Sequence, residues 1–164
     1  MSLIVPSETA VVRAAEAETL GGEGFPSTAR LLLDSSSTND ALSLVRITLA
    51  EGANGATPHR HSTASELFYV LGGEVQVLAD DKVLTLGEGD AAVVPPEVAH
   101  AFAATPGSGA DLLIVITPGV ERFGYFRLLA KVALGQADLQ ELLAAQDKYD
   151  NHFLDSPAWT AARA

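Results

Sequence analysis

The sequence contains no cysteine, which excludes both a disulfide framework and a thiolate metal site. Any bound metal ion must therefore be held by imidazole nitrogen and carboxylate oxygen. Apolar runs such as 112–116 are short, far below the roughly 20 residues that a membrane-spanning helix needs. The first residues have no basic start and only a brief apolar stretch, so they predict no secretory signal. We therefore expect a cytoplasmic protein with no membrane partner.

Positive charge is also scarce. The 164 residues include 10 lysines and arginines against 21 acidic residues, which gives a formal net charge of −11. Such a surface repels a phosphate backbone, so we expect no nucleic-acid partner. An apolar content of 48% over this length is enough for one hydrophobic core and too little for two comfortable ones. We expect a single domain over residues 1–164.

Short apolar stretches alternate with clusters of turn-forming residues along most of the chain. This rhythm is typical of an all-β barrel or sandwich whose strands are joined by hairpins. No helical periodicity separates the stretches, which argues against a parallel sheet. We expect a core barrel over about 29–118, preceded by an N-terminal strand segment over 1–28. The expected strands are 29–33, 42–49, 67–71, 74–78, 83–86, 91–94, 98–102 and 112–117, with the glycine pair 72–73 as one of the turns.

The pattern changes after residue 119. Aromatic and aliphatic residues recur at steps of three and four over 123–134, which predicts an amphipathic helix that ends at Gly135. Asp138 and Glu141 have the spacing of a capping box, so a second helix is expected from there to Gln146. The extension 119–164 is therefore predicted to contain two helices, and their apolar faces should cover the outside of the barrel or one of its mouths.

Two histidines in the middle of the chain have the spacing of a strand. His59 and His61 are two residues apart, so both imidazoles should project to the same face and can converge on one ion. Arg60 between them should point away and form a surface ion pair. Glu66 opens the next strand on the same face as Phe68. Because a buried unpaired carboxylate is costly, a cation is an attractive partner for Glu66 if that face is interior.

A second segment of similar build carries a third histidine. A Pro-Pro turn at 95–96 is followed by His100, which shares a strand face with Phe102. Phe68 and Phe102 are candidate pocket walls, because they share faces with Glu66 and His100. The fourth histidine, His152, lies in a polar tail and is predicted to be structural or solvated.

The two segments resemble the paired motifs of the cupin superfamily over about residues 41–118. The first motif falls on Gly52, His59, His61, Glu66 and Gly73, with one gap a residue longer than usual; the second falls on Gly89, Pro95 and His100, with Glu97 and Ala104 in place of its usual Gly and Asn. The resemblance implies a jelly-roll barrel, also called a double-stranded β-helix. It also implies one divalent transition metal ion, held by the three histidines and the glutamate.

Three imidazoles and a carboxylate suit iron, nickel, manganese, zinc, cobalt or copper. Segments 9–13 and 117–123 are similar to one-domain cupins grouped with quercetin dioxygenases. That resemblance implies a dioxygenase-like enzyme for a small enolic or aromatic oxygen-bearing substrate, with Glu66 as catalytic base, and a homodimer. A metal-dependent isomerase or lyase, and a non-catalytic protein that binds a metal or a small molecule, remain as alternatives.

Overall fold

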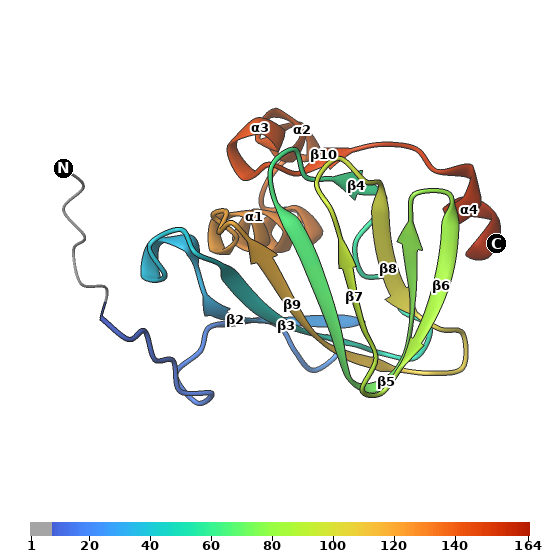
Figure 1. Ribbon diagram of the computed structural model, residues 1–164, viewed down its shortest axis with the longest axis horizontal. Coiled ribbons are helices and arrows are strands. Elements are labelled where there is room, and N and C mark those ends of the chain that lie inside the picture. The colour runs from blue at the N-terminus through green and yellow to red at the C-terminus, as the bar shows by residue number, and fades with distance from the viewer. Residues whose placement is uncertain (1–7) are drawn as a thin grey trace.

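The computed structural model describes residues 8–164, which fold around antiparallel β-sheet (Figure 1). The strands are β1 Thr19–Gly21, β2 Ser27–Leu33, β3 Ser43–Leu49, β4 His59–Arg60, β5 Ser65–Ala79, β6 Lys82–Gly87, β7 Ala91–Val94, β8 His100–Ala104, β9 Ala110–Thr117 and β10 His152–Phe153. The helices are α1 Phe123–Ala133, α2 Leu139–Ala144, α3 Gln146–Tyr149 and α4 Pro157–Ala162, with a 3₁₀ turn at Ser35–Ser37. The predicted all-β jelly-roll barrel is confirmed. Residues 1–7 of the predicted N-terminal strand segment lie outside the described residues.

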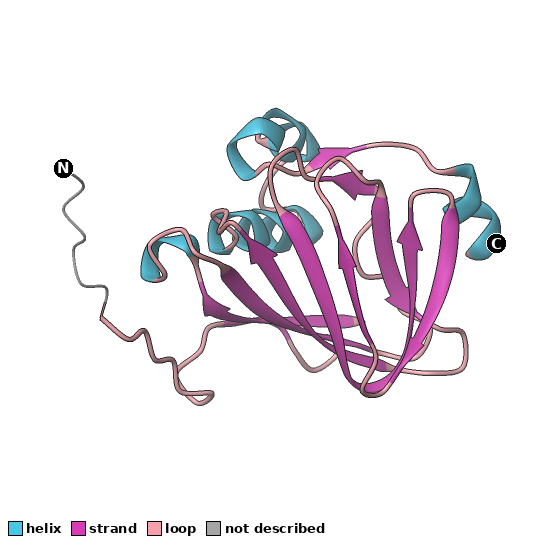
Figure 2. Cartoon of the chain, in the orientation of Figure 1, coloured by secondary structure: helices cyan, strands magenta, loops and turns pink. Residues whose placement is uncertain are grey.

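The long strand β5 belongs to both sheets of the barrel. Its first half pairs with β7 and β9, and that sheet continues through β3 and β2 to β1. Its second half pairs with β6 and β8, and that sheet continues through β4 to β10. Figure 2 shows the strands of the two sheets, and residues from both sheets form the main core. The two predicted motifs therefore meet across β5, β4 and β8.

The expected turn at the glycine pair 72–73 was wrong. β5 runs through both glycines, and its register against β9 shifts between Val70 and Gly72. Gly73 has a φ of 71°, and a side chain there would collide with the carbonyl oxygen of Gly109. The glycines therefore bend the strand from one sheet into the other. Glycine marks a bend and a turn alike in sequence, which explains the error.

Side chains alternate along β5 as predicted. Glu66, Phe68 and Val70 are buried on the inner face, whereas Tyr69 is 41% exposed on the outer face. The inner faces of the other strands supply aliphatic and aromatic side chains to the same core. Besides Phe68, this core includes Leu31, Val45, Ile47, Leu49, Phe102, Leu112 and Ile114.

The C-terminal extension contains four short helices, not the two that the sequence predicted. The first was placed correctly, and the second begins with the predicted capping box at Asp138 but already ends at Ala144. α3 has a single turn and α4 has six residues, too few for periodicity to identify them. Trp159 of α4 packs on Ala101 and Ala103, so β8 is buried on both faces. Among residues 8–164, no helix is long and apolar enough to cross a membrane.

Candidate metal centre

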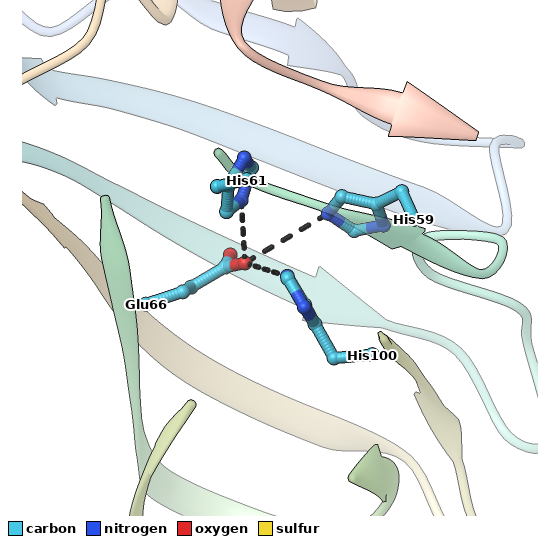
Figure 3. A group of neighbouring side chains, drawn as sticks. All are labelled: His59, His61, Glu66 and His100. Atoms are coloured by element: carbon cyan, nitrogen blue, oxygen red, sulfur yellow. Dashed lines mark hydrogen bonds and ion pairs between the residues drawn. The ribbon is translucent and has the colours of Figure 1, made fainter. Parts of the chain in front are cut away.

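The four predicted ligand residues lie together inside the barrel (Figure 3). His59 belongs to β4, His61 follows it, Glu66 begins the inner face of β5, and His100 begins β8. All four are buried, and their ligand atoms lie within 4.8 Å of one another. Oε2 of Glu66 is 2.6 Å from Nε2 of His100, 3.0 Å from Nε2 of His61 and 3.8 Å from Nε2 of His59. One nitrogen of each ring thus faces a common point.

Backbone carbonyl groups fix the orientation of the three rings. His59 and His100 each donate from Nδ1 to the carbonyl oxygen two residues earlier, at 2.8 and 2.9 Å. His61 donates from Nδ1 to the carbonyl oxygen of Asp150 at 2.5 Å. A proton held on Nδ1 leaves the Nε2 lone pair free, which is the tautomer that a metal ion requires. The local fold therefore prepares three neutral imidazole ligands.

Asp150 is a supporting residue that the sequence did not reveal. It follows α3 in the left-handed conformation, with a φ of 47°. Its carboxylate accepts hydrogen bonds from the backbone of Ser62 at 2.7 Å and of Thr63 at 3.1 Å. His152 lies beside this carboxylate, at 3.2 Å, and outside the ligand group. The C-terminal extension thus holds the chain on both sides of His61 in place, through pairing of β10 with β4 and through Asp150.

Glu97 occupies a position where the cupin motif usually has glycine, and it connects the two motif segments. Its φ is 67°, a conformation that costs a residue with a side chain about 1–2 kcal/mol. Its backbone N–H donates to the carbonyl oxygen of His61 at 2.7 Å. Its carboxylate pairs with Arg60 at 2.7 Å on the surface, the ion pair that was expected of Arg60. These contacts tie the turn before His100 to the ligand His61.

Interactions among the four ligand residues favour the ionised form of the Glu66 carboxylate. Burial opposes ionisation of Glu66, but His100 and His61 outweigh it and hold the pKa of Glu66 well below its ordinary value. Burial also disfavours a charged His100, yet the carboxylate of Glu66 raises the pKa of His100 above 6.5. Burial and the neighbouring His100 lower the pKa of His59 well below 6.5. In the absence of a metal ion, the carboxylate of Glu66 therefore favours the protonated form of His100, and an ion that binds there competes with that proton.

A cavity of about 790 Å³ adjoins the four residues. His59 and Glu66 form part of its wall, and the rest is mainly apolar. Ile47, Leu49 and Ile114 line it from the sheet, Phe126 and Leu129 from α1, and Leu142 and Leu143 from α2. α1 and α2 therefore cover a mouth of the barrel, one of the two placements predicted for the helices, and line the space beside the ligands.

The two aromatic pocket candidates have different positions. Phe102 lines the cavity. Phe68 is fully buried outside the lining, with its ring 5.5 Å from that of Phe102 between centroids. Sequence reasoning missed three other polar residues of the wall, Arg122, Tyr125 and Asn151, which all come from the C-terminal extension. A strand pattern cannot indicate them, because only the folded path of the extension brings them to the barrel.

Comparison with known proteins agrees with this geometry. Residues 45–116 match the family model of the cupin domain, and this stretch contains all four residues of the group. Residues 45–116 of this chain form a cupin domain. No curated protein matches the chain. Similar solved structures include KdgF from a Halomonas species, at 21% identity over 68% of this cupin and 94% of that chain, with a TM-score of 0.57.

Two further solved structures are slightly more similar in sequence. An RmlC-like cupin from Shewanella frigidimarina is 26% identical over 71% of this chain and 96% of its own, with a TM-score of 0.57. A predicted oxalate decarboxylase from Thermotoga maritima is 25% identical over 65% of this chain and 97% of its own, with a TM-score of 0.55. Each of these chains is covered almost completely, so the extra length of this cupin lies largely outside the shared barrel.

The donor set of this cupin fits one divalent transition metal ion. Three neutral imidazoles and a carboxylate are ligands that iron, nickel, manganese, zinc, cobalt and copper accept, so the donors alone do not select among these metals. Histidines that bind a metal ion through one ring nitrogen ordinarily donate a hydrogen bond from the other to a carbonyl or carboxylate oxygen. All three histidines here donate from Nδ1 to a backbone carbonyl oxygen. His59, His61, Glu66 and His100 could therefore hold such an ion.

Proposed function

We propose that this cupin is a metal-dependent enzyme for a small oxygen-bearing molecule. The observation that carries the proposal is the convergence of four buried ligand atoms beside a largely apolar cavity of about 790 Å³, whose wall includes His59 and Glu66. Small-molecule sites are typically apolar clefts of about 300–1,000 Å³ with a few convergent polar groups. The cavity has this size and this character, and its lining includes the polar residues Arg122, Tyr125 and Asn151.

The leading reaction class is a dioxygenase-like oxidation. A metal ion bound by His59, His61, Glu66 and His100 would supply Lewis acidity or redox chemistry with dioxygen. The residues of this chain would exclude water with the apolar wall and place an enolic or aromatic substrate beside His59 and Glu66. Glu66 would be the base that accepts a proton from the substrate, since it is the one carboxylate among the four residues. The resemblance of segments 9–13 and 117–123 to the quercetin dioxygenase group supports this class.

A metal-dependent lyase or isomerase is the second candidate, and Tyr125 favours it. Burial raises the pKa of Tyr125 to about 12, so its hydroxyl keeps its proton at neutral pH. A protonated hydroxyl in the cavity wall can donate a hydrogen bond to a developing oxyanion, which eliminations and isomerisations produce. The Thermotoga protein is described as a predicted decarboxylase, which is a lyase.

A substrate screen under air and under nitrogen separates these classes. The protein is purified without a chelating tag, its metal content is measured, and small enols, phenols and hydroxy acids are supplied. Oxygen consumption linked to product supports the dioxygenase, and equal conversion under nitrogen supports the lyase or isomerase. Tight binding of compounds without any turnover would contradict an enzymatic role and leave a binding protein.

A further inference from the structure

Arg122 is a buried cation, and part of its hydrogen-bonding capacity is not satisfied by the residues around it. It is 4% exposed, and no carboxylate among residues 8–164 lies within 4 Å of its guanidinium. Its backbone N–H, not its side chain, ties the start of α1 to Asp34, at 2.7 Å. Burying a charge without an ion pair is costly, so a purely structural role at this position would favour an apolar residue.

The contacts of the guanidinium leave hydrogen-bond capacity free. One terminal nitrogen donates to the carbonyl oxygen of Tyr149 at 3.3 Å, and the other to Oδ1 of Asn151 at 3.4 Å, both long. The group stacks over the ring of Tyr125, 4.3 Å from its centroid. Nε of Arg122 and Nδ2 of Asn151 are buried and have no hydrogen-bond partner. Two buried donors without acceptors indicate that an acceptor binds there.

These donors belong to the same cavity as the candidate metal ligands. Arg122, Tyr125 and Asn151 line it together with His59 and Glu66. With a divalent ion bound and the imidazoles neutral, Glu66 leaves one positive charge at the centre, and Arg122 adds a second. Asp155 also lines the cavity, but its side chain is exposed, so solvent and salt screen its negative charge. A buried site with this excess of positive charge favours an anionic ligand. The planar guanidinium matches a carboxylate in particular, because its N–H groups form a fork.

We infer that Arg122, Tyr125 and Asn151 bind the carboxylate of an anionic substrate whose other oxygen faces His59 and Glu66. The inference rests on the proposed function and names its substrate class. A hydroxy or keto carboxylate has the required pair of oxygen groups. Tyr125 contributes a hydroxyl that stays protonated, and Asn151 contributes its buried Nδ2 group, which lies beside that hydroxyl.

Salicylate and its neutral amide, salicylamide, test this inference. Both have the same ring and phenolic oxygen, and they differ in the charge of the second group. Binding to the zinc-loaded protein is measured by calorimetry for wild type, Arg122→Met and Arg122→Lys. Arg127→Met is the matched control, because Arg127 lies in α1, which begins just after Arg122, and its half-exposed side chain pairs with Glu18. Circular dichroism and zinc content are recorded for every sample.

Wild type should bind salicylate at least about tenfold more tightly than salicylamide, as expected for hydrogen bonds to a charged group. Arg122→Met should lose about tenfold to a hundredfold in salicylate affinity and little in salicylamide affinity. Arg127→Met should match wild type. If Arg122→Met does not fold, Arg122→Lys provides the test, since it keeps the charge but loses the fork and should also weaken salicylate selectively.

Two results would overturn the inference. One is wild-type protein that shows no preference for salicylate, whether both compounds bind equally or neither binds. The other is salicylate binding that is unchanged in the folded Arg122 variants. The measured metal content tests the proposed function independently of this inference. If the protein takes up no metal, the proposed function fails, but a salicylate preference of the metal-free protein that Arg122→Met abolishes would still support the anion site.

Discussion

Asp150 should control metal affinity from the C-terminal extension, although it is not a ligand. Its carbonyl oxygen receives the Nδ1 proton of His61, and its carboxylate accepts backbone hydrogen bonds from Ser62 and Thr63. Asp150→Gly removes the carboxylate and suits the φ of 47°, because glycine adopts positive φ without strain. The carbonyl oxygen remains, but the segment that presents it to His61 loses its anchor.

The magnitude follows from these contacts. Hydrogen bonds to a charged group are worth about 1.5–3 kcal/mol. Because the Asp150 side chain is 15% exposed, the free energy of unfolding should fall by about that amount. Loss of an outer contact of a metal ligand typically costs about 10–100-fold in metal affinity. We therefore expect zinc affinity, measured by competition with a chromophoric chelator, to fall by about 10–100-fold in Asp150→Gly. Asp150→Asn, which keeps an acceptor oxygen, should lose less.

Asp80 provides the matched control. It is exposed in the turn between β5 and β6 and has a φ of 58°, so Asp80→Gly makes the same chemical change away from the site. Asp80→Gly should keep wild-type zinc affinity. If Asp150→Gly also kept wild-type affinity while its thermal unfolding temperature fell, the extension would stabilise the fold without orienting His61, and the reasoning would be refuted.

The remaining predictions concern the base, the pH dependence and the assembly. Glu66→Gln should keep the fold and much of the metal while turnover falls by about 10²–10⁴, the usual contribution of a positioned base, and wild-type turnover would remove Glu66 from the mechanism. Because the pKa of His100 is raised, this ring keeps its proton to a higher pH than a free imidazole, and the proton must leave when a metal ion binds. Metal affinity should therefore rise with pH through 6.5 and above. Titration at several pH values with proton-release calorimetry checks this, and occupancy unchanged down to about pH 5 would contradict histidine ligation. We also expect a homodimer through the outer face that carries Tyr69 and Val93, which are 41% and 61% exposed. Light scattering at micromolar concentration checks the mass, Val93→Asp should weaken the dimer, and a monomeric wild type would show the prediction to be wrong.

The barrel and the ligand group could be predicted because their signals are local. His59 and His61 share a face through the two-residue period of a strand, and Glu66 and Phe68 do so for the same reason. The folded protein keeps these shared faces, because each strand must bury one face in the core. The family resemblance then related the two segments to each other, which the period alone could not do.

The cavity wall could not be predicted, because it depends on contacts between distant parts of the chain. Arg122, Tyr125 and Asn151 lie in an extension whose path across the barrel mouth is set by short elements such as α3 and β10. Elements of two to four residues have no periodicity to detect. Asp150 illustrates the same limit, because its contact with His61 spans 89 residues and depends on a left-handed backbone conformation.

The metal-to-chain ratio of untagged protein tests the central claim most directly. It should be measured by elemental analysis for wild type and for His59→Ala, His61→Ala and His100→Ala, with circular dichroism to show that each variant is folded. We predict close to one transition metal ion per wild-type chain and a strong loss in each folded variant, because each imidazole supplies one of only four donors. Full metal retention in all three variants, or a wild type that takes up no metal even when it is supplied, would contradict the account.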